Sequence, residues 1–191
     1  MTERRGLLSA SVAVFSMLAL TGAALATLSE GLAQTDGAER ISPDWLEVDK
    51  ENRKVDLYIV AGLTTNNSGW NFNGYASGEL TIAIPLGWLV QIRYTSRDMQ
   101  SPHSVGILEI EDEIPVSGDP AKVKVAFPRA FSLQFTRGAF GPNEDTFDFR
   151  ANKTGRFWLF CGVPVHAKGG MWDYFVVSDE ISEPYVEVIK K

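Results

Sequence analysis

Cysteine and histidine, the residues that form disulfides or bind soft and borderline metals, are scarce in this chain. Its 191 residues include one cysteine, Cys161, and two histidines, His103 and His166. A single cysteine excludes an internal disulfide and any binuclear centre that needs two bridging thiolates. Two histidines are too few for an enzyme with several copper sites. The chain can therefore supply such donors to one small site at most.

Positive charge is also in short supply. The formal net charge is −6 at pH 7, and the body of the chain has no run of Lys and Arg. This composition disfavours nucleic-acid binding, which needs a basic surface. An acidic balance can instead steer encounters with a basic partner.

Long apolar runs are missing except at the N-terminus, where one extends from Leu7 to Leu28 behind a pair of arginines. It is long enough to cross a bilayer as a helix, and its basic flank should stay in the cytoplasm. We expect residues 1–33 to be a signal peptide or a membrane anchor, and an A-L-A cleavage pattern ending at Ala26 keeps both open. The body is then exported. It lies on the extracytoplasmic face of the cell membrane if anchored, or in the periplasm or extracellular space if the segment is cleaved.

Sustained helical periodicity is absent after this apolar run. Residues 34–50 are small, polar and charged, and we expect a linker there. Residues 51–191 indicate a single domain of short strands bounded by Gly, Pro, Asp, Asn and Ser. This pattern predicts an all-β sandwich or barrel, preceded by one N-terminal hydrophobic helix. The expected strands cover residues 55–61, 78–85, 88–96, 104–110, 121–127, 131–138, 145–151, 155–162, 170–178 and 185–191.

Cys161, His166 and Met171 share one stretch, CGVPVHAKGGM, between two expected strands. In a helix, Cys161 and His166 would lie about 140° apart, and Pro164 and the glycines disfavour a helix in any case. A loop that returns on itself can turn all three side chains inward. Two imidazoles, a thiolate and a weak axial thioether form the blue-copper donor set, and His103 is the second imidazole available.

Other chemistries fit these residues less well. Zinc could bind Cys161 and the two histidines, but it would leave Met171 unused. A nucleophilic cysteine would be expected at a helix N-terminus or a tight elbow, and no such pattern surrounds Cys161. Each residue taken singly is more often part of a core. Their joint presence favours a metal site.

The loop FCGVPVHAKGGMW, with SPHSVGI upstream, resembles the cupredoxins, the single-domain blue copper proteins. The C-x4-H-x4-M spacing is similar to that of sulfocyanins and of rusticyanins. The segment WNFNGYASGELTIAIPLGW resembles sulfocyanins in particular, where an N-F-N-G stretch precedes a strand pair. The resemblance covers about residues 55–191. One departure is Val165, which stands before the histidine where a glycine is expected.

The resemblance implies a Greek-key β-sandwich or barrel that binds one copper ion and cycles it between Cu(I) and Cu(II). Carried over by motif, the copper ligands are His103, Cys161, His166 and Met171. Ser104 would lie beside these ligands without binding the metal. The protein would be a monomer and not an enzyme. It would carry single electrons between respiratory-chain partners, such as a cytochrome or a terminal oxidase, on the outer face of the cytoplasmic membrane. The electron would leave near His166, and the apolar surroundings predict a fairly high reduction potential.

Two alternative interpretations remain open. The same fold could serve copper delivery or storage, although copper carriers favour open sites rich in Met and His, and this chain has 4 Met and 2 His. A metal-free β-sandwich could instead serve as an interaction module. In that case, replacing Cys161 by Ser would leave its function intact.

Overall fold

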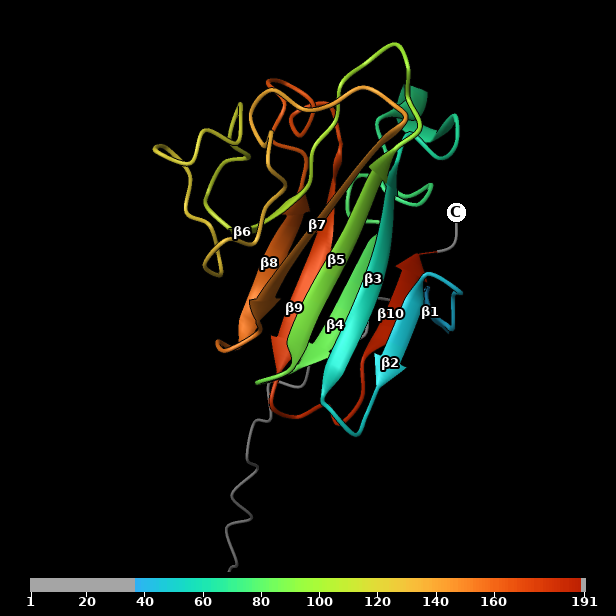
Figure 1. The fold of residues 1–191 in the computed structure, drawn as a ribbon, viewed down its shortest axis with the longest axis vertical. Coiled ribbons are helices and arrows are strands. Elements are labelled where there is room, and N and C mark those ends of the chain that lie inside the picture. The colour runs from blue at the N-terminus through green and yellow to red at the C-terminus, as the bar shows by residue number, and fades with distance from the viewer. Residues whose placement is uncertain (1–36, 190–191) are drawn as a thin grey trace, which may run out of the picture. The chain divides into compact units, whose positions relative to one another are not determined.

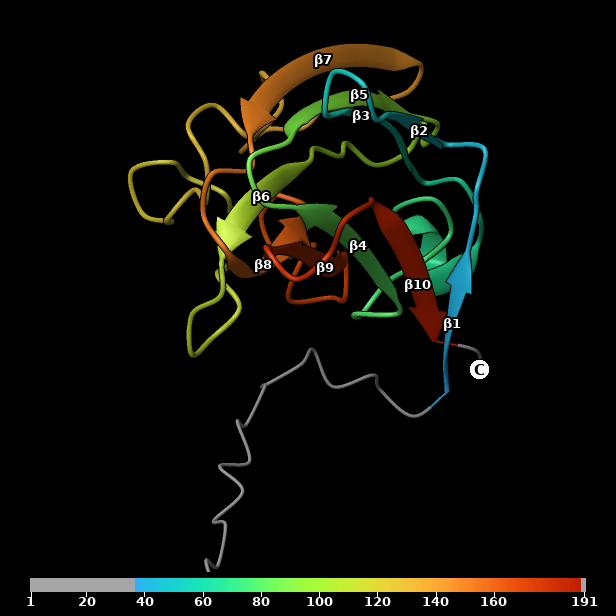
Figure 2. The same ribbon diagram turned by 90° about the horizontal axis from the view of Figure 1, so that it is seen from below.

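The computed structural model describes residues 37–189, which fold into two facing β-sheets (Figures 1 and 2). One sheet has six strands in the order β1-β10-β4-β9-β8-β6, and the other has four in the order β2-β3-β5-β7. The elements are β1 (Ala38–Ile41), β2 (Leu46–Asp49), β3 (Lys54–Ala61), η1 (Asn66–Gly69), β4 (Leu80–Pro85), β5 (Leu89–Ser96), β6 (Gly106–Glu109), β7 (Asn143–Arg150), β8 (Gly155–Phe160), β9 (Trp172–Ser178) and β10 (Tyr185–Ile189).

The core lies between the two sheets because their strands alternate inward apolar and outward polar side chains. Strands β3 and β5 each bury every second residue. Burying an aliphatic side chain contributes about 1.5–3 kcal/mol, so these rows supply much of the driving force for folding. The fully buried side chains of these two strands are Val55, Leu57, Ile59, Ala61, Val90 and Ile92.

Two short strands lie in the stretch that we expected to be a linker. Strand β1 pairs with β10, and β2 pairs with β3, both antiparallel. Ile41, Trp45 and Leu46 are partly buried and pack against the core, which holds this stretch in place. Each of these strands has only 4 residues, and no alternating pattern in the sequence marked them.

The strands predicted for residues 121–127 and 131–138 are wrong. These segments run beside β6 through isolated bridges, Leu108 with Val125 and Gly106 with Phe131. Their apolar residues are buried as the alternation suggested, for example Phe127 and Phe135. Nearby proline and glycine residues interrupt the pairing, so these buried segments form no continuous ladder of hydrogen bonds with β6.

The predicted signal peptide or anchor at residues 1–33 lies outside the described residues. Within residues 37–189, the structure contains no helix with the length and apolar character needed to span a bilayer.

Strand order fixes where the copper-loop residues meet. Strands β6 and β8 are antiparallel neighbours, with Gly106 opposite Phe160, so the start of β6 lies beside the end of β8. Strand β8 also pairs with β9, opposite Trp172. The segment before β6 and the β8–β9 loop therefore meet at one end of the sandwich, the upper end in Figure 1.

Candidate metal centre

The β8–β9 loop returns on itself, as the glycines and proline predicted. The backbone N–H of Cys161 donates to the carbonyl of Met171 (3.2 Å), and the N–H of Met171 donates to the carbonyl of His166 (2.9 Å). The N–H of His166 donates in turn to Val163 (3.2 Å). These bonds place the three sequence-predicted loop residues on one compact turn.

His103 reaches the same place from the segment that precedes β6. It exchanges two backbone hydrogen bonds with Ala139, at 3.0 and 2.8 Å, which fix its position beside the loop. Its side chain is fully buried. The ring centroids of His103 and His166 lie 5.1 Å apart.

Three donor groups therefore converge in the core. Donor atoms of His103, Cys161 and His166 all lie within 4.8 Å of one another. The Cys161 Sγ to His166 Nδ1 distance is 3.7 Å. Met171 is fully buried at the end of the same loop, and the role of its thioether as axial ligand stays a prediction.

Burial sets the protonation of these groups. It lowers the pKa of His166 to about 4 and also lowers the pKa of His103, so both rings are neutral near pH 7. Burial raises the pKa of Cys161 to about 11, so the thiol must lose its proton when a metal binds.

The donor set fits a copper ion. Neutral imidazoles and a thiolate are the ligands that soft or borderline metals prefer. Nδ1 of His103 is buried and has no hydrogen-bond partner among the described residues. A buried polar atom of this kind is rare, and a metal ion would satisfy it.

A layer of polar side chains surrounds these donors. The Ser104 hydroxyl donates to the Phe135 carbonyl (2.6 Å), accepts from the Gly162 N–H (2.9 Å), and lies 3.9 Å from Cys161 Sγ. Asp98 Oδ2 lies 3.0 Å from His103 Nε2. Partial burial acts to raise the pKa of Asp98, but hydrogen bonds outweigh it and hold this pKa below its usual range. Sequence analysis found Ser104 but missed Asp98, because nothing distinguishes one acidic loop residue from the others.

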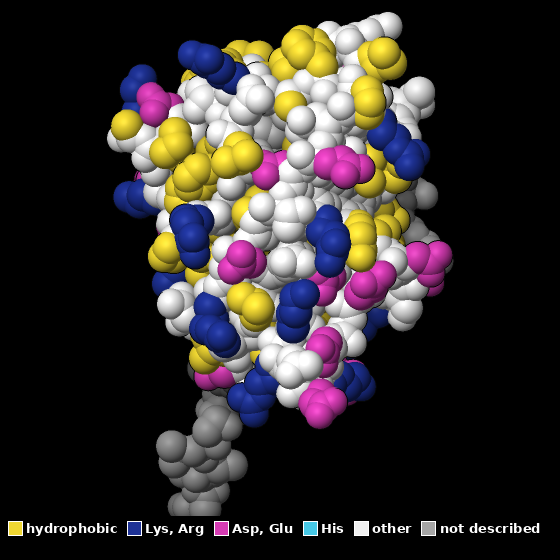
Figure 3. Space-filling view, viewed as in Figure 1, with side chains coloured by type: hydrophobic (Ala, Val, Ile, Leu, Met, Phe, Trp, Pro, Cys, Tyr) yellow, Lys and Arg dark blue, Asp and Glu magenta, His cyan; other side chains and the backbone are white. Residues whose placement is uncertain are grey.

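Trp70 is a second residue that sequence analysis missed. Its indole stacks on His166, with ring centroids 4.0 Å apart and an interplanar angle of 17°. The side-chain amide of Asn67 donates to the carbonyls of Trp70 (2.9 Å) and Gly169 (3.0 Å), tying the two loops together. His166 is therefore only 5% exposed, and on the face shown in Figure 3 no histidine reaches the surface.

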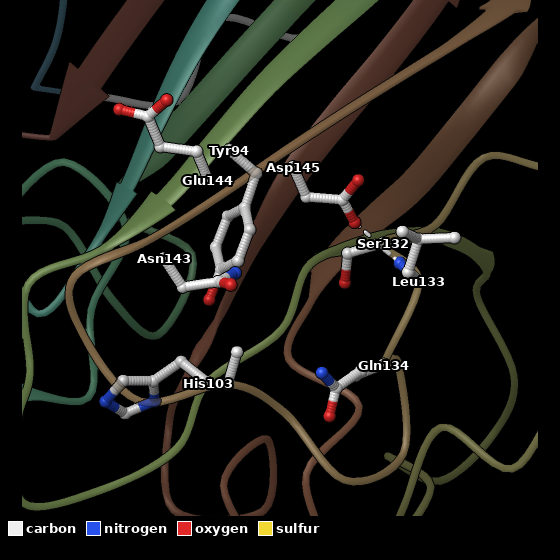
Figure 4. A pocket seen from close by; sticks show the side chains of 9 residues that line it. Tyr94, His103, Ser132, Leu133, Gln134, Asn143, Glu144 and Asp145 are labelled. Atoms are coloured by element: carbon white, nitrogen blue, oxygen red, sulfur yellow. Dashed lines mark hydrogen bonds between the residues drawn. The ribbon is translucent and has the colours of Figure 1, made fainter.

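A small cavity adjoins the site. It has a volume of about 50 Å³ and is lined by His103 together with Tyr94, Ser132 and Asn143, among others (Figure 4). Pockets that hold small organic substrates usually measure about 300–1,000 Å³. This cavity has room for solvent but not for such a substrate.

Comparison with known proteins identifies the family. A family model described as the Sulfocyanin (SoxE) domain matches residues 42–188. The chain belongs to the sulfocyanin family. The sulfocyanin of Sulfolobus acidocaldarius is 29% identical to it over 140 residues, which cover 72% of this chain and 70% of that protein.

Two solved structures are similar to this chain. A structure of rusticyanin variants aligns with a TM-score of 0.50 and 17% identity, covering 74% of this chain and 97% of that one. Auracyanin A, a "blue" copper protein of Chloroflexus aurantiacus, aligns with a TM-score of 0.46 and 17% identity, covering 65% and 99%.

The cupredoxin prediction and the all-β fold class are thus confirmed. As a sulfocyanin-family cupredoxin with a buried His-Cys-His group, the protein is an electron carrier whose cofactor is one type 1 copper ion.

Proposed function

We propose that this member of the sulfocyanin family carries single electrons with His103, Cys161, His166 and Met171 as copper ligands. The convergence of the first three in the buried interior is the observation that carries this proposal. Copper, when bound, supplies the one-electron couple between Cu(I) and Cu(II). The chain itself does no bond chemistry, so we propose that it is not an enzyme.

The task of the protein is to hold the donors still while the charge at the site changes. The loop hydrogen bonds and the antiparallel ladder of β8 and β9 supply that rigidity. Cys161, Val163 and Met171 are part of the main apolar core. A dry surrounding destabilises the more highly charged Cu(II) state, so we expect a fairly high reduction potential.

We propose that partners dock on an apical patch, defined as Met99, Val116, Phe140 and Val165. These side chains are 75%, 52%, 55% and 54% exposed. Their segments touch in two pairs: the Val165 N–H donates to the Val116 carbonyl (2.8 Å), and the Gly141 N–H donates to the Asp98 carbonyl (2.7 Å). Exposed apolar side chains gather at this upper end in Figure 3. Transient redox encounters use small interfaces of this kind.

We further propose that the partners are respiratory redox proteins, such as a cytochrome or a terminal oxidase. The meeting place would be the extracytoplasmic face of the membrane, since the apolar N-terminal run of the sequence favours export. Protease treatment of intact cells tests the location. Degradation of the protein without lysis supports it, and protection until lysis contradicts it.

A Val165→Asp variant tests the docking surface. Placing a carboxylate on the apical patch should slow electron exchange with respiratory membranes while leaving the visible spectrum unchanged. Ile110→Asp, at the opposite end of β6, is the matched control because it adds the same charge to another exposed apolar residue. Equal rates for both variants would count against the patch.

The copper site itself is tested by visible absorption. The full chain, purified in mild detergent, is titrated with Cu(II) and then treated with ascorbate. We expect an intense blue band that bleaches on reduction and returns on oxidation, and we expect Cys161→Ser to lose it. A wild-type protein that stays colourless, or shows only weak Cu(II) bands, would overturn the electron-carrier proposal.

The buried site also bears on copper delivery. His103 and Cys161 are fully buried and His166 is 5% exposed. Handing copper to another protein requires ligands that the acceptor can reach. This geometry favours an ion that stays in place while electrons pass.

A further inference from the structure

The Asp98 carboxylate uses both of its oxygens as acceptors. Oδ1 accepts the backbone N–H groups of Gln100 (2.8 Å) and Ser101 (3.0 Å). Oδ2 lies 3.0 Å from Nε2 of His103. The two bonds to Oδ1 fix the turn at residues 98–101. The contact at Oδ2 is made to His103, a predicted copper ligand.

This contact at Oδ2 selects one form of His103. A neutral imidazole carries one proton and has one free lone pair. Because a carboxylate accepts but does not donate, the contact requires the proton of His103 on Nε2. The lone pair then lies on Nδ1, which is buried and unpartnered among the described residues.

The same turn also approaches the other histidine. Ser101 Oγ lies 3.5 Å from Nε2 of His166. In His166 it is Nδ1 that faces Cys161, at 3.7 Å. Residues 98–101 therefore sit behind both imidazoles, on the side away from the atoms that would bind the metal.

We propose that Asp98 is a positioning residue that holds His103 in the Nε2–H tautomer and biases the centre toward Cu(II). This inference rests on the proposed copper ligands. The carboxylate places a negative charge one imidazole ring away from the metal position, which favours the more positive oxidation state. It thereby opposes the effect of the apolar core on the reduction potential.

An asparagine cannot replace this carboxylate fully. Its carbonyl oxygen could accept from either the two backbone N–H groups or the imidazole N–H, but not from both. Its NH2 group would then point at the remaining N–H, and two donors cannot form a hydrogen bond. Asp98→Asn therefore removes the charge and breaks one set of contacts at nearly constant volume.

The matched control is Asp119→Asn. Asp119 also accepts a backbone N–H two residues ahead, from Ala121 (3.1 Å), but contacts no histidine. Both substitutions remove one negative charge from an Asx-type turn. Only the first affects His103.

The first measurement uses the copper-free full chain. Nitrogen-15 NMR of the histidine rings reports which nitrogen carries the proton. We expect Nε2–H for wild-type His103, and a mixture of tautomers in Asp98→Asn. A wild-type ring protonated on Nδ1 would overturn the inference, even if the variant failed to fold.

The second measurement uses the copper-loaded chain. Outer-layer partners of metal-binding histidines contribute about 10–100-fold to metal affinity. We expect Asp98→Asn to lose Cu(II) affinity by such a factor, and to lose less Cu(I) affinity because the missing charge matters most for Cu(II). Each tenfold loss confined to Cu(II) raises the reduction potential by about 59 mV. Asp119→Asn should match wild type in both quantities.

Unchanged affinity and potential in Asp98→Asn would refute the positioning role. A wild-type chain that binds no copper would instead refute the proposed function, while the NMR result would still judge the role of Asp98 in setting the tautomer. The two failures can therefore be told apart.

Discussion

Val165 holds a backbone conformation that valine rarely adopts. Its φ is +68°, in the left-handed region, next to the predicted ligand His166. For residues other than glycine this region costs about 1–2 kcal/mol, and branching at Cβ makes it less favourable still. The sequence marked this position because a glycine was expected there. The structure shows that valine occupies a glycine-like conformation there.

Replacing Val165 by Gly should therefore stabilise the protein. Relief of backbone strain outweighs the added flexibility of the unfolded chain, which costs about 0.5–1 kcal/mol. We expect a net gain of up to about 1 kcal/mol in the free energy of unfolding, measured by denaturant titration.

The control for this change is Val116→Gly. Val116 is similarly exposed, and its φ is not positive. It lacks the strain but carries the same entropic cost, so this variant should lose stability. If both variants shifted stability in the same direction and by the same amount, the strain at Val165 would be refuted.

Cys161 makes copper affinity depend on pH. Its pKa of about 11 and the pKa of about 4 at His166 mean that, between these values, the copper-free site holds a thiol proton and a neutral imidazole. Copper must displace that one proton, so falling pH favours the copper-free thiol. We expect Cu(II) affinity to rise about tenfold per pH unit near neutrality.

A competition titration with a chelator of known pH dependence, at several pH values near 7, measures this slope. In Cys161→Ser the slope should disappear along with the blue band. A wild-type affinity that does not vary with pH would show that the thiol is ionised before copper arrives.

The sequence revealed only those site residues whose type is rare in this chain. Cys161 and the two histidines could be found because no other residues of their kind compete with them. Asp98 and Trp70 could not be found, because their roles depend on contacts across loops. A carboxylate or an indole carries no sequence signal for the imidazole that it will face.

At the scale of elements, the loop between β3 and β4 supports the site from outside. Beyond Leu57 the edge of β3 is no longer covered by β2. Asn73 takes over there: its Oδ1 accepts the Val60 N–H (2.6 Å) and its Nδ2 donates to the Tyr58 carbonyl (2.9 Å). The Asn73 amide thus supplies the two hydrogen bonds that a neighbouring strand would otherwise make to β3. Asn73 belongs to the loop that carries Trp70.

Removing this amide should loosen the loop. We expect Asn73→Gly to lower the free energy of unfolding by about 1–3 kcal/mol, because the Val60 N–H is left without its partner. Glycine is chosen because Asn73 has a φ of +50°, which glycine adopts without strain. Hydrogen exchange measured residue by residue should show the Val60 amide losing protection.

Asn152→Gly provides the comparison. Asn152 is exposed, and its side chain makes no hydrogen bond to any residue between 37 and 189. Its replacement should cost no more than the general entropic cost of a glycine. If the two variants were equally stable, the amide of Asn73 would have no structural role.

Strand prediction succeeded for the long alternating strands β3 and β5, and failed for β1, β2 and residues 121–138. Strands β3 and β5 have 8 residues each and show their period clearly. Strands β1 and β2 are held by pairing with distant segments, which a local pattern does not report. Residues 121–138 have the composition of strands, but they form an irregular loop that is held in place by its buried apolar side chains.

At the scale of the whole molecule, the sequence predicted the class of fold and the two segments that form the site. The sheet order could not be read locally, since β3 pairs in parallel with β5 and β4 with β9. Parallel pairs require long connections, and these carry both the supporting loop and the predicted ligands. The family resemblance supplied what the local pattern could not.

The meeting of His103 with Cys161 and His166 also has a consequence for the lifetime of the protein. With one cysteine the chain can form no internal disulfide, so a shared metal ion would be its strongest tie between these distant segments. A disulfide restricts the unfolded chain, whereas a metal that binds only the folded chain stabilises it by mass action. We expect copper-free copies to open and be degraded sooner, so that turnover enriches the population in molecules already able to carry an electron.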